Sequence, residues 1–292
     1  MAGVRTRDAP IGVFDSGVGG LTVLRALRAA LPREDFLYLG DTARLPYGTK
    51  SRDSVVQYAL QASSLLVERG IKCLVVACNT ASAVSLPAMR AAYAGLPVIG
   101  VLEPGATAAC DATRNDHIAV IATEGTVQGG AYQAAIRARR PQARVTSLGC
   151  QVFVALAEEG WTSGSVATES ARCYLGGLFN GQGPDRPDTL VLGCTHFPML
   201  AGPIRAVVGA DVAIVDSAVT AAQATYRCLS GLGLLAAGRG QVALLATDSP
   251  ARFARVGSAF LGEPVDAGQV ELVDLSAAGN TATAGFAPRS VR

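Results

Sequence analysis

The chain of 292 residues is 50% hydrophobic and 16% charged, and its formal net charge is +2. Such a high apolar content excludes an intrinsically disordered chain, and the length suits two modest domains. The near-neutral charge, without a basic run, gives no reason to expect a nucleic-acid partner, and no apolar run approaches the roughly 18 residues that a membrane-spanning helix needs.

Short apolar runs alternate with helix-like stretches along the chain, a pattern typical of parallel sheets wrapped by helices. Four leucines between residues 21 and 31 recur at spacings of three and four, which predicts a helix, and Ser249 with Pro250 predicts the start of a later one. The small polar residues after Ser276 predict a frayed end. The predicted strands are Ile11–Phe14, Phe36–Leu39, Leu74–Ala77, Val98–Val101, Ile118–Ala122, Arg144–Ser147, Thr189–Leu192, Val212–Val215, Gln241–Ala246 and Glu271–Val273.

Two stretches of the chain resemble each other as a weak internal repeat. The segments IGVFDSGVGG at 11–20 and IAVIATEGTVQGG at 118–130 both combine an apolar strand, a polar residue and a glycine-rich turn. The segments VVACNT at 75–80 and VLGCTH at 191–196 both place a cysteine and a polar pair after a strand. Because ligands of open α/β sheets gather at the carboxyl ends of strands, these segments predict a site shared by two related units.

The expected fold class is therefore α/β, with two pseudo-symmetric three-layer domains, mainly parallel sheets, and an active site in the cleft between them. The first domain is predicted to comprise residues 1–101 and 213–292, and the second domain residues 102–212. We expect the chain to cross between the domains at a turn formed by residues 103–105, and to return near Val212.

The seven cysteines are an odd number, they form no CxxC pair, and the apolar run at 11–14 is too short for the core of a signal peptide. This usage predicts a reduced, cytoplasmic protein with free thiols. With only two histidines to assist, the sequence predicts no metal site.

Cys78 and Cys194 each follow an apolar strand and precede polar residues, at matching places in the two halves. A single cysteine is usually a small buried hydrophobe, and this interpretation suits the others. The pair is different, because a helix N-terminus lowers a thiol pKa from about 8.5, and two such thiols can act as bases on opposite faces of one substrate. The other cysteines are Cys73, Cys110, Cys150, Cys173 and Cys228.

Several polar residues near these cysteines have ordinary structural interpretations as well as functional ones. Asp15 with Ser16 can form a turn into a helix, and Tyr47 with Gly48 can form a proline-containing turn. The pairs Asn79-Thr80 and Thr195-His196 can cap helices, and Glu158 can be a solvated helix charge.

Six motifs in chain order resemble the glutamate racemases of the aspartate/glutamate racemase superfamily. The resemblance extends from about Ile11 to Val273. The motifs are FDSGVGGLTV (14–23), DTARLPYGTKS (41–51), ACNTAS (77–82), EPG (103–105), LGCTHFP (192–198) and VDSA (215–218).

The resemblance implies interconversion of L-glutamate and D-glutamate without pyridoxal phosphate or a metal, which supplies D-glutamate for bacterial peptidoglycan. The Cα proton is weakly acidic, so inversion needs one base on each face of the substrate. By resemblance, Cys78 acts on D-glutamate and Cys194 on L-glutamate. No cofactor is expected, the partner is the small molecule glutamate, and a homodimer is implied.

The resemblance also assigns roles to the polar residues. Asp15 would assist Cys78, His196 would pair with Cys194, and Glu158 would lie near the active site in the segment CQVFVALAE at 150–158, where Gln151 replaces the usual proline. The residues implied in substrate binding are Asp15, Ser16, Tyr47, Gly48, Asn79, Thr80, Thr195 and His196.

Two alternative functions compete with this one. An aspartate racemase or another two-cysteine member of the superfamily usually resembles Cys-Thr-Glu after the second cysteine, whereas this chain has Cys194-Thr195-His196. A binding module that kept the fold and lost catalysis would have no need of both cysteines and their polar neighbours.

Overall fold

Two parallel sheets form the frame of the protein, whose computed structural model describes residues 6–181 and 185–275. The frayed end predicted after Ser276 lies outside the described residues. The six-stranded sheet contains β1 (Ile11–Asp15), β2 (Phe36–Gly40), β3 (Cys73–Val76), β4 (Val98–Gly100), β9 (Val242–Ala246) and β10 (Val270–Leu272). The four-stranded sheet contains β5 (His117–Ala122), β6 (Arg144–Gly149), β7 (Thr189–Gly193) and β8 (Ala213–Asp216).

The two sheets repeat one topology. The six-stranded sheet has the order β10-β9-β2-β1-β3-β4, the four-stranded sheet has the order β6-β5-β7-β8, and the strand pairs of both sheets are parallel. The order β2-β1-β3-β4 therefore recurs as β6-β5-β7-β8. This confirms the predicted α/β class with two related, mainly parallel sheets. Below, each sheet with the helices packed on it is called the first or the second domain.

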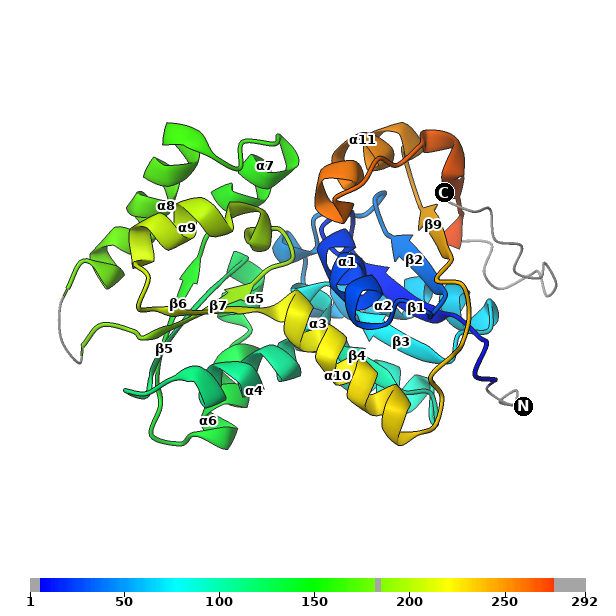
Figure 1. Cartoon of the computed structure of the whole chain (residues 1–292), viewed down its shortest axis with the longest axis horizontal. Helices are drawn as coiled ribbons and strands as arrows, with labels where there is room; N and C mark the ends of the chain where they lie inside the picture. Colours follow the sequence, from blue (N-terminus) through cyan, green and yellow to red (C-terminus); the bar gives the residue numbers. More distant parts are fainter. Residues whose placement is uncertain (1–5, 182–184, 276–292) are drawn as a thin grey trace.

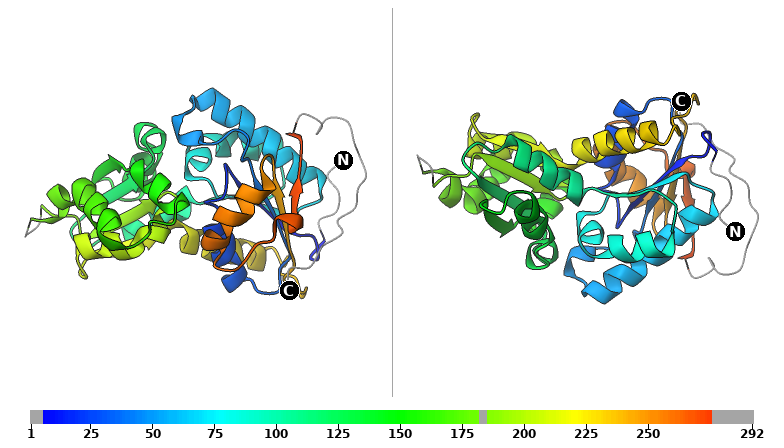
Figure 2. Two further views of the ribbon diagram at one scale, coloured as in Figure 1. Left: turned by 90° about the horizontal axis from the view of Figure 1, so that it is seen from above. Right: turned by 90° about the horizontal axis from the view of Figure 1, so that it is seen from below.

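Helices cover both faces of each sheet, so each domain has three layers (Figures 1 and 2). On the first sheet, α1 (Leu21–Ala30), α10 (Ser217–Gly231) and α11 (Pro250–Leu261) pack on one face, and α2 (Arg52–Glu68) and α3 (Asn79–Ala92) on the other. On the second sheet, α4 (Leu102–Ala112) and α6 (Ala131–Arg139) pack opposite α7 (Val152–Glu158), α8 (Gly164–Phe179) and α9 (Ala201–Val208).

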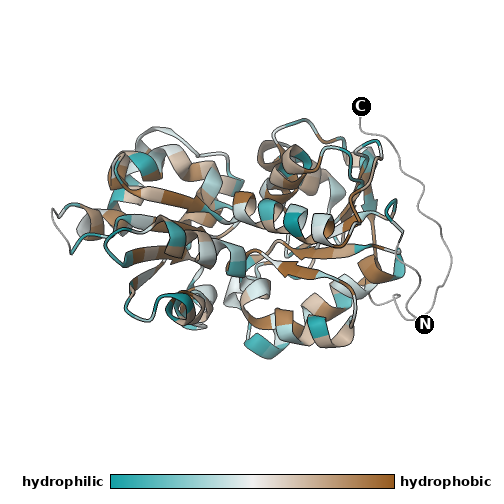
Figure 3. Ribbon diagram, turned by 60° about the horizontal axis from the view of Figure 1, so that its bottom comes forward, coloured by the Kyte–Doolittle hydropathy of each residue, from teal (hydrophilic) through white to brown (hydrophobic). Residues whose placement is uncertain are grey.

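The central strands are buried along their whole length and mostly apolar because both of their faces are covered, and brown strands are visible in Figure 3. Residues of β1 such as Val13 and Phe14 are fully buried, on opposite faces. The helix predicted from the leucines of residues 21–31 is α1, and α11 begins at Pro250 as predicted.

Two of the predicted boundaries are wrong. Residues 103–105 do not form a turn, because they belong to the first turns of α4, where a proline is tolerated since the N–H it lacks would be unpaired there. Residues 213–216 do not return to the first domain, because β8 pairs with β7 in the second sheet. The chain returns only after Asp216, through α10, which packs on both α1 and α4.

A buried ion pair anchors the edge of the first domain that lies away from the second. The ammonium of Lys72 is fully buried, pairs with the carboxylate of Glu34, and donates to the carbonyl oxygen of Leu234 at 2.9 Å. The other Glu34 oxygen accepts the backbone N–H of Ala236 at 2.8 Å. These bonds hold the segment after α10 against the start of β3.

We predict that Glu34→Gln lowers the free energy of unfolding by about 3 kcal/mol, because it leaves the buried Lys72 charge without a counter-charge. Urea denaturation monitored by circular dichroism measures this. Glu263→Gln is the matched control, since its partnership with Arg28 is half exposed and is worth at most about 1 kcal/mol. Equal losses in the two variants would contradict the prediction.

Candidate active site

A small cavity of about 50 Å³ lies where the carboxyl ends of the central strands of the two sheets face each other. Segments after β1, β2 and β3 reach it from the first domain, and segments after β5, β6 and β7 reach it from the second. The first domain contributes Ser16, Pro46, Tyr47, Gly48, Cys78, Asn79 and Thr80, and the second contributes Thr123, Gln151, Val154, Gly193, Cys194, Thr195 and His196.

Every site residue predicted from the sequence lines this cavity, except Asp15 and Glu158. Glu158 instead contacts the lining residue His196. The sequence reasoning missed Thr123, which follows β5 as Ser16 follows β1, so a closer alignment of the two repeat segments would have found it. Val154 was also missed, and Gln151 was noticed only as a departure from the family pattern.

Cys78 is the N-cap residue of α3, and its sulfur accepts the backbone N–H of Ala81 at 3.4 Å. The hydrogen bond from Ala81 lowers the thiol pKa as this position predicts, but stronger effects outweigh it. Burial and the nearby charge of Asp15 raise the pKa of Cys78 to about 12, against the weaker opposing effect of hydrogen bonds from Ser16 and Ala81. Cys78 is therefore a neutral thiol at neutral pH.

Cys194 begins a chain of contacts that ends at the protein surface. Its sulfur lies 3.7 Å from Nδ1 of His196, and Nε2 of that ring lies 3.2 Å from Glu158. The second oxygen of Glu158 accepts a hydrogen bond from Arg252 of α11 at 2.8 Å. Burial disfavours a charged imidazole, but the hydrogen bonds to Cys194 and Glu158 outweigh it and raise the pKa of His196 to about 10.

Asp15 is a buried carboxyl group that does not itself line the cavity. It is almost fully buried at the end of β1, where Oδ2 accepts the backbone N–H of Gly17 at 2.9 Å. Burial raises the pKa of its carboxyl group, against hydrogen bonds from the turn and the charge of His196. Its charge thus acts on both Cys78 and His196.

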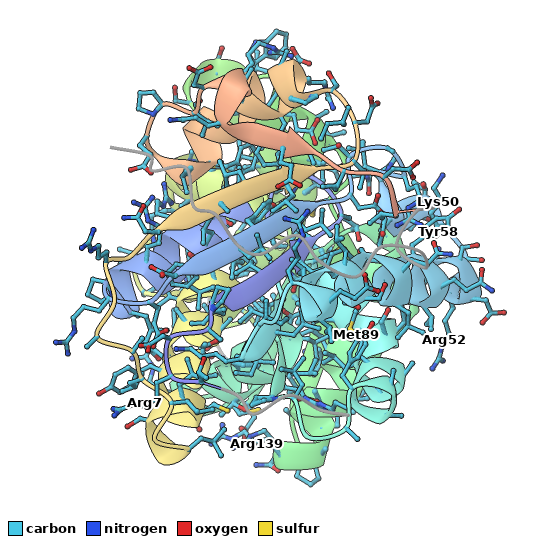
Figure 4. All side chains as sticks on the ribbon, turned by 90° about the vertical axis from the view of Figure 1, so that its right-hand side faces the viewer. Arg7, Lys50, Arg52, Tyr58, Met89 and Arg139 are labelled. Atoms are coloured by element: carbon cyan, nitrogen blue, oxygen red, sulfur yellow. The ribbon has the colours of Figure 1, made fainter. Side chains whose placement is uncertain are left out.

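Tyr47 reaches the cavity from η1 (Tyr47–Thr49), and its hydroxyl donates to the buried carboxylate of Asp41. Arg44 donates to the same carboxylate at 2.7 Å and stacks its guanidinium 4.4 Å from the centre of the Tyr58 ring. Figure 4 shows Tyr58 at one edge of the first domain beside Lys50 and Arg52, where η1 leads into α2. The Tyr47 side chain is therefore held in place by a network that ends in solvent.

Hydrogen bonds between the domains fix the cavity walls. The hydroxyl of Tyr132 in α6 donates to the side-chain oxygen of Asn79 at 2.7 Å. The hydroxyl of Thr80 lies 3.2 Å from that of Thr123. On the other wall, the hydroxyl of Thr22 donates to the carbonyl oxygen of Thr195 at 2.9 Å.

Two glycines allow the domains to approach this closely. A Cβ at Gly19 would lie 2.4 Å from the Thr195 hydroxyl and 2.4 Å from the His196 ring, and a Cβ at Gly48 would lie 2.9 Å from Thr123. Glycine is required at such backbone contacts because any side chain would collide. The glycine-rich turn after β1 therefore serves domain contact as well as access of its N–H groups to a ligand.

None of the described residues that line the cavity is a lysine or an arginine. An anionic ligand would be held there by hydroxyls, by the His196 ring and by N–H groups, including those at the start of α3. In residues 6–181 and 185–275, no group of three or more His, Cys, Asp or Glu side chains is arranged to hold a metal ion.

The chain is similar to known proteins over most of its length. The family described as Asp/Glu/Hydantoin racemase matches residues 11–225. A glutamate racemase of Geobacter metallireducens is 49% identical over 269 residues, which cover 91% of this chain and 97% of that protein.

Two crystal structures have closely similar folds. Glutamate racemase from Thermus thermophilus, in complex with β-chloro-D-alanine, is 43% identical with a TM-score of 0.82, over 93% of this chain and 99% of that one. Glutamate racemase from Francisella tularensis, in complex with D-glutamate, is 34% identical with a TM-score of 0.85, over the same shares of the two chains.

We predict that Gly19→Ala lowers the free energy of unfolding by about 1–3 kcal/mol, because the new methyl group pushes Thr195 and His196 out of a filled contact. Thermal and urea unfolding measure this. Gly177→Ala, at an exposed position of α8 with open space around it, should be neutral or stabilising by up to about 1 kcal/mol. A neutral Gly19→Ala would argue against the close contact.

A second prediction concerns the reactivity of Cys78 in the ligand-free protein. Because its pKa of about 12 lies far above the assay range, its alkylation by iodoacetamide should accelerate about tenfold per pH unit from pH 7 to 9. Asp15→Asn removes a charge that raises this pKa, so it should speed alkylation at every pH. Mass spectrometry of the modified peptides follows both rates.

The exposed Cys173 is the internal control for general thiol chemistry in the same samples. A plateau in the Cys78 rate below pH 9, or slower alkylation in Asp15→Asn, would show that the thiol is not held neutral by burial and by Asp15.

Proposed function

The chain belongs to the glutamate racemases of the Asp/Glu/hydantoin racemase family, and on this premise we propose that Cys78 and Cys194 are the two bases that interconvert L-glutamate and D-glutamate. The observation that carries the proposal is that both thiols line one cavity, one from each domain, after equivalent strands. A substrate between them exposes opposite faces of its Cα to the two sulfurs.

In the direction from L-glutamate, Cys194 acts as thiolate and removes the Cα proton, while Cys78 returns a proton to the opposite face. The raised pKa of Cys78 supports this role, because a thiol that stays protonated is ready to donate. His196 lies within reach of the Cys194 sulfur and takes or returns the thiol proton. Glu158 and Arg252 do not line the cavity, so we assign them to positioning His196.

In the direction from D-glutamate, Cys78 must first lose its proton. The charge of Asp15 raises the pKa of that thiol and so opposes this loss, but burial also raises the pKa of Asp15 itself and makes it a better proton acceptor. We therefore assign Asp15 to assisting the transfer as the acceptor of the Cys78 proton. The positive ammonium of a bound amino acid would lower the pKa of Cys78 and so favour its thiolate, whereas the negative charge of Asp15 raises that pKa. Substrate binding and activation of Cys78 are therefore coupled.

The remaining cavity residues bind the substrate in this proposal. The two carboxylates of glutamate meet hydroxyl and N–H donors, since none of the described lining residues is a lysine or an arginine. Aspartate is the less supported substrate, because the relatives of 42–49% identity are glutamate racemases. The substrate-binding residues are Asp15, Ser16, Tyr47, Gly48, Asn79, Thr80, Thr195 and His196, of which Asp15 does not itself line the cavity.

The wider setting follows from the same proposal. D-glutamate made by this chain would enter bacterial peptidoglycan, and the reaction would need no pyridoxal phosphate or metal. The seven cysteines form no disulfide, which supports a reducing compartment such as the cytoplasm. No helix in the described residues has the length and apolarity to cross a bilayer. The homodimer implied by the resemblance stays a prediction.

Circular dichroism of the purified protein with L-glutamate tests the function. Without any added cofactor, we expect loss of optical activity from glutamate and little from aspartate. Cys78→Ser and Cys194→Ser should each lower kcat by about 10²–10⁴-fold, because a serine hydroxyl is too weak an acid to replace either thiol. Near wild-type turnover in one of these variants would contradict the assignment of the two cysteines as the two bases.

A substrate with a leaving group separates the two thiols and serves as the control for correct folding. Loss of HCl from a 3-chloroglutamate needs only one base, so each serine variant should keep it for one enantiomer. Cys78→Ser should act on the L-form through Cys194, and Cys194→Ser should act on the D-form through Cys78. The opposite pattern would reverse the assignment of the two faces.

A further inference from the structure

One face of α7 looks into the cavity. Gln151, the N-cap residue, and Val154 one turn later both line the wall, and Glu158 one further turn along holds His196. Residues spaced in this way share one side of a helix. Residues on the other side of the helix, such as Val152, are exposed to solvent. The side chain of Gln151 is therefore presented to the cavity by the helix that also positions the Cys194 partner.

The side-chain oxygen of Gln151 is buried and has no hydrogen-bond partner, and among the residues lining the cavity it is the one buried side-chain polar atom in this state. The neighbouring polar groups are already engaged: Asn79 accepts from Tyr132, and Thr80 bonds Thr123. An unpaired buried acceptor destabilises a protein, so such a group at a ligand site indicates a missing donor.

Glutamate can supply one kind of donor. Its two carboxylates only accept hydrogen bonds and would be repelled by an amide oxygen, whereas its α-ammonium carries three N–H donors. Resting on the proposed function, we propose that Gln151 is a substrate-binding residue whose side-chain oxygen accepts a hydrogen bond from the α-ammonium of glutamate.

This contact has a consequence for selectivity. The ammonium is attached to Cα, so holding it at α7 orients the reacting carbon between the walls that carry Cys78 and Cys194. A dicarboxylate of the same length without an amino group, such as glutarate, cannot make the bond. Gln151 thereby favours amino acids over the dicarboxylates that the hydroxyl and N–H donors alone would accept.

Gln151→Met tests the contact, because methionine keeps the length of the side chain and removes its polar atoms. We expect KM for both enantiomers of glutamate to rise about tenfold, which equals about 1.4 kcal/mol, with kcat changed less than about threefold. The inhibition constant of glutarate should stay within about twofold of wild type. Val152→Met, on the exposed side of the same helix, is the matched control and should change none of these values.

Gln151→Glu is a second variant that keeps an oxygen acceptor. It should bind glutamate within about threefold of wild type and bind the dianion glutarate at least about tenfold more weakly. If Gln151→Met weakens glutarate as much as glutamate, the amide holds a carboxylate instead and the ammonium assignment is wrong. If Gln151→Met changes neither the KM for glutamate nor the inhibition constant of glutarate, Gln151 does not contact the substrate. This inference then fails, while the proposed function stands. A wild-type protein that does not racemise glutamate overturns the proposed function and this inference with it.

Discussion

The close contact between the carboxyl ends of the two sheets is the constraint on which the cavity depends. At Gly19 and Gly48, the backbone of one domain touches side chains of the other at distances that leave no room for a Cβ. Since the sheets are parallel, these same edges carry the loops with the two cysteines. The approach of the domains therefore creates a water-poor space with a thiol in each wall, where electrostatic effects are stronger than in solvent.

The two walls differ in charge although the domains share a topology. The carboxyl group of Asp15 raises the pKa of Cys78 in one wall, whereas in the other wall Cys194 lies near His196, whose own pKa is raised. The substrates of a racemase are mirror images with equal free energy, so the asymmetry cannot change their equilibrium. It acts instead on the proton transfer at each wall separately. The network from Cys194 to Arg252 extends this difference to the surface of the first domain.

Much of the fold could be predicted from the sequence because its signals are local. A strand buried on both faces must be apolar along its length, and β1, β3, β5 and β7 were recognisable for that reason. The boundaries of the helices and of the domains were harder to predict. The Glu103-Pro104-Gly105 segment has the composition of a turn, yet proline and an acidic residue also suit the first turn of α4. The place of β8 was decided by pairing with β7, which is a long-range contact.

The sequence by itself determined which residues follow each strand, and so it placed Cys78, Cys194 and their polar neighbours at one predicted edge of the sheets. Only the tertiary structure decided their electrostatic state. The N-cap position of Cys78 is visible locally, but the burial that raises its pKa comes from the packing of distant segments around it. Likewise, Arg252 donates a hydrogen bond to Glu158, which lies 94 residues away in the chain. The buried side-chain oxygen of Gln151 has no hydrogen-bond partner, which also depends on the folded surroundings of that residue. Desolvation and long-range contacts depend on the whole fold, so they cannot be predicted from the local sequence pattern.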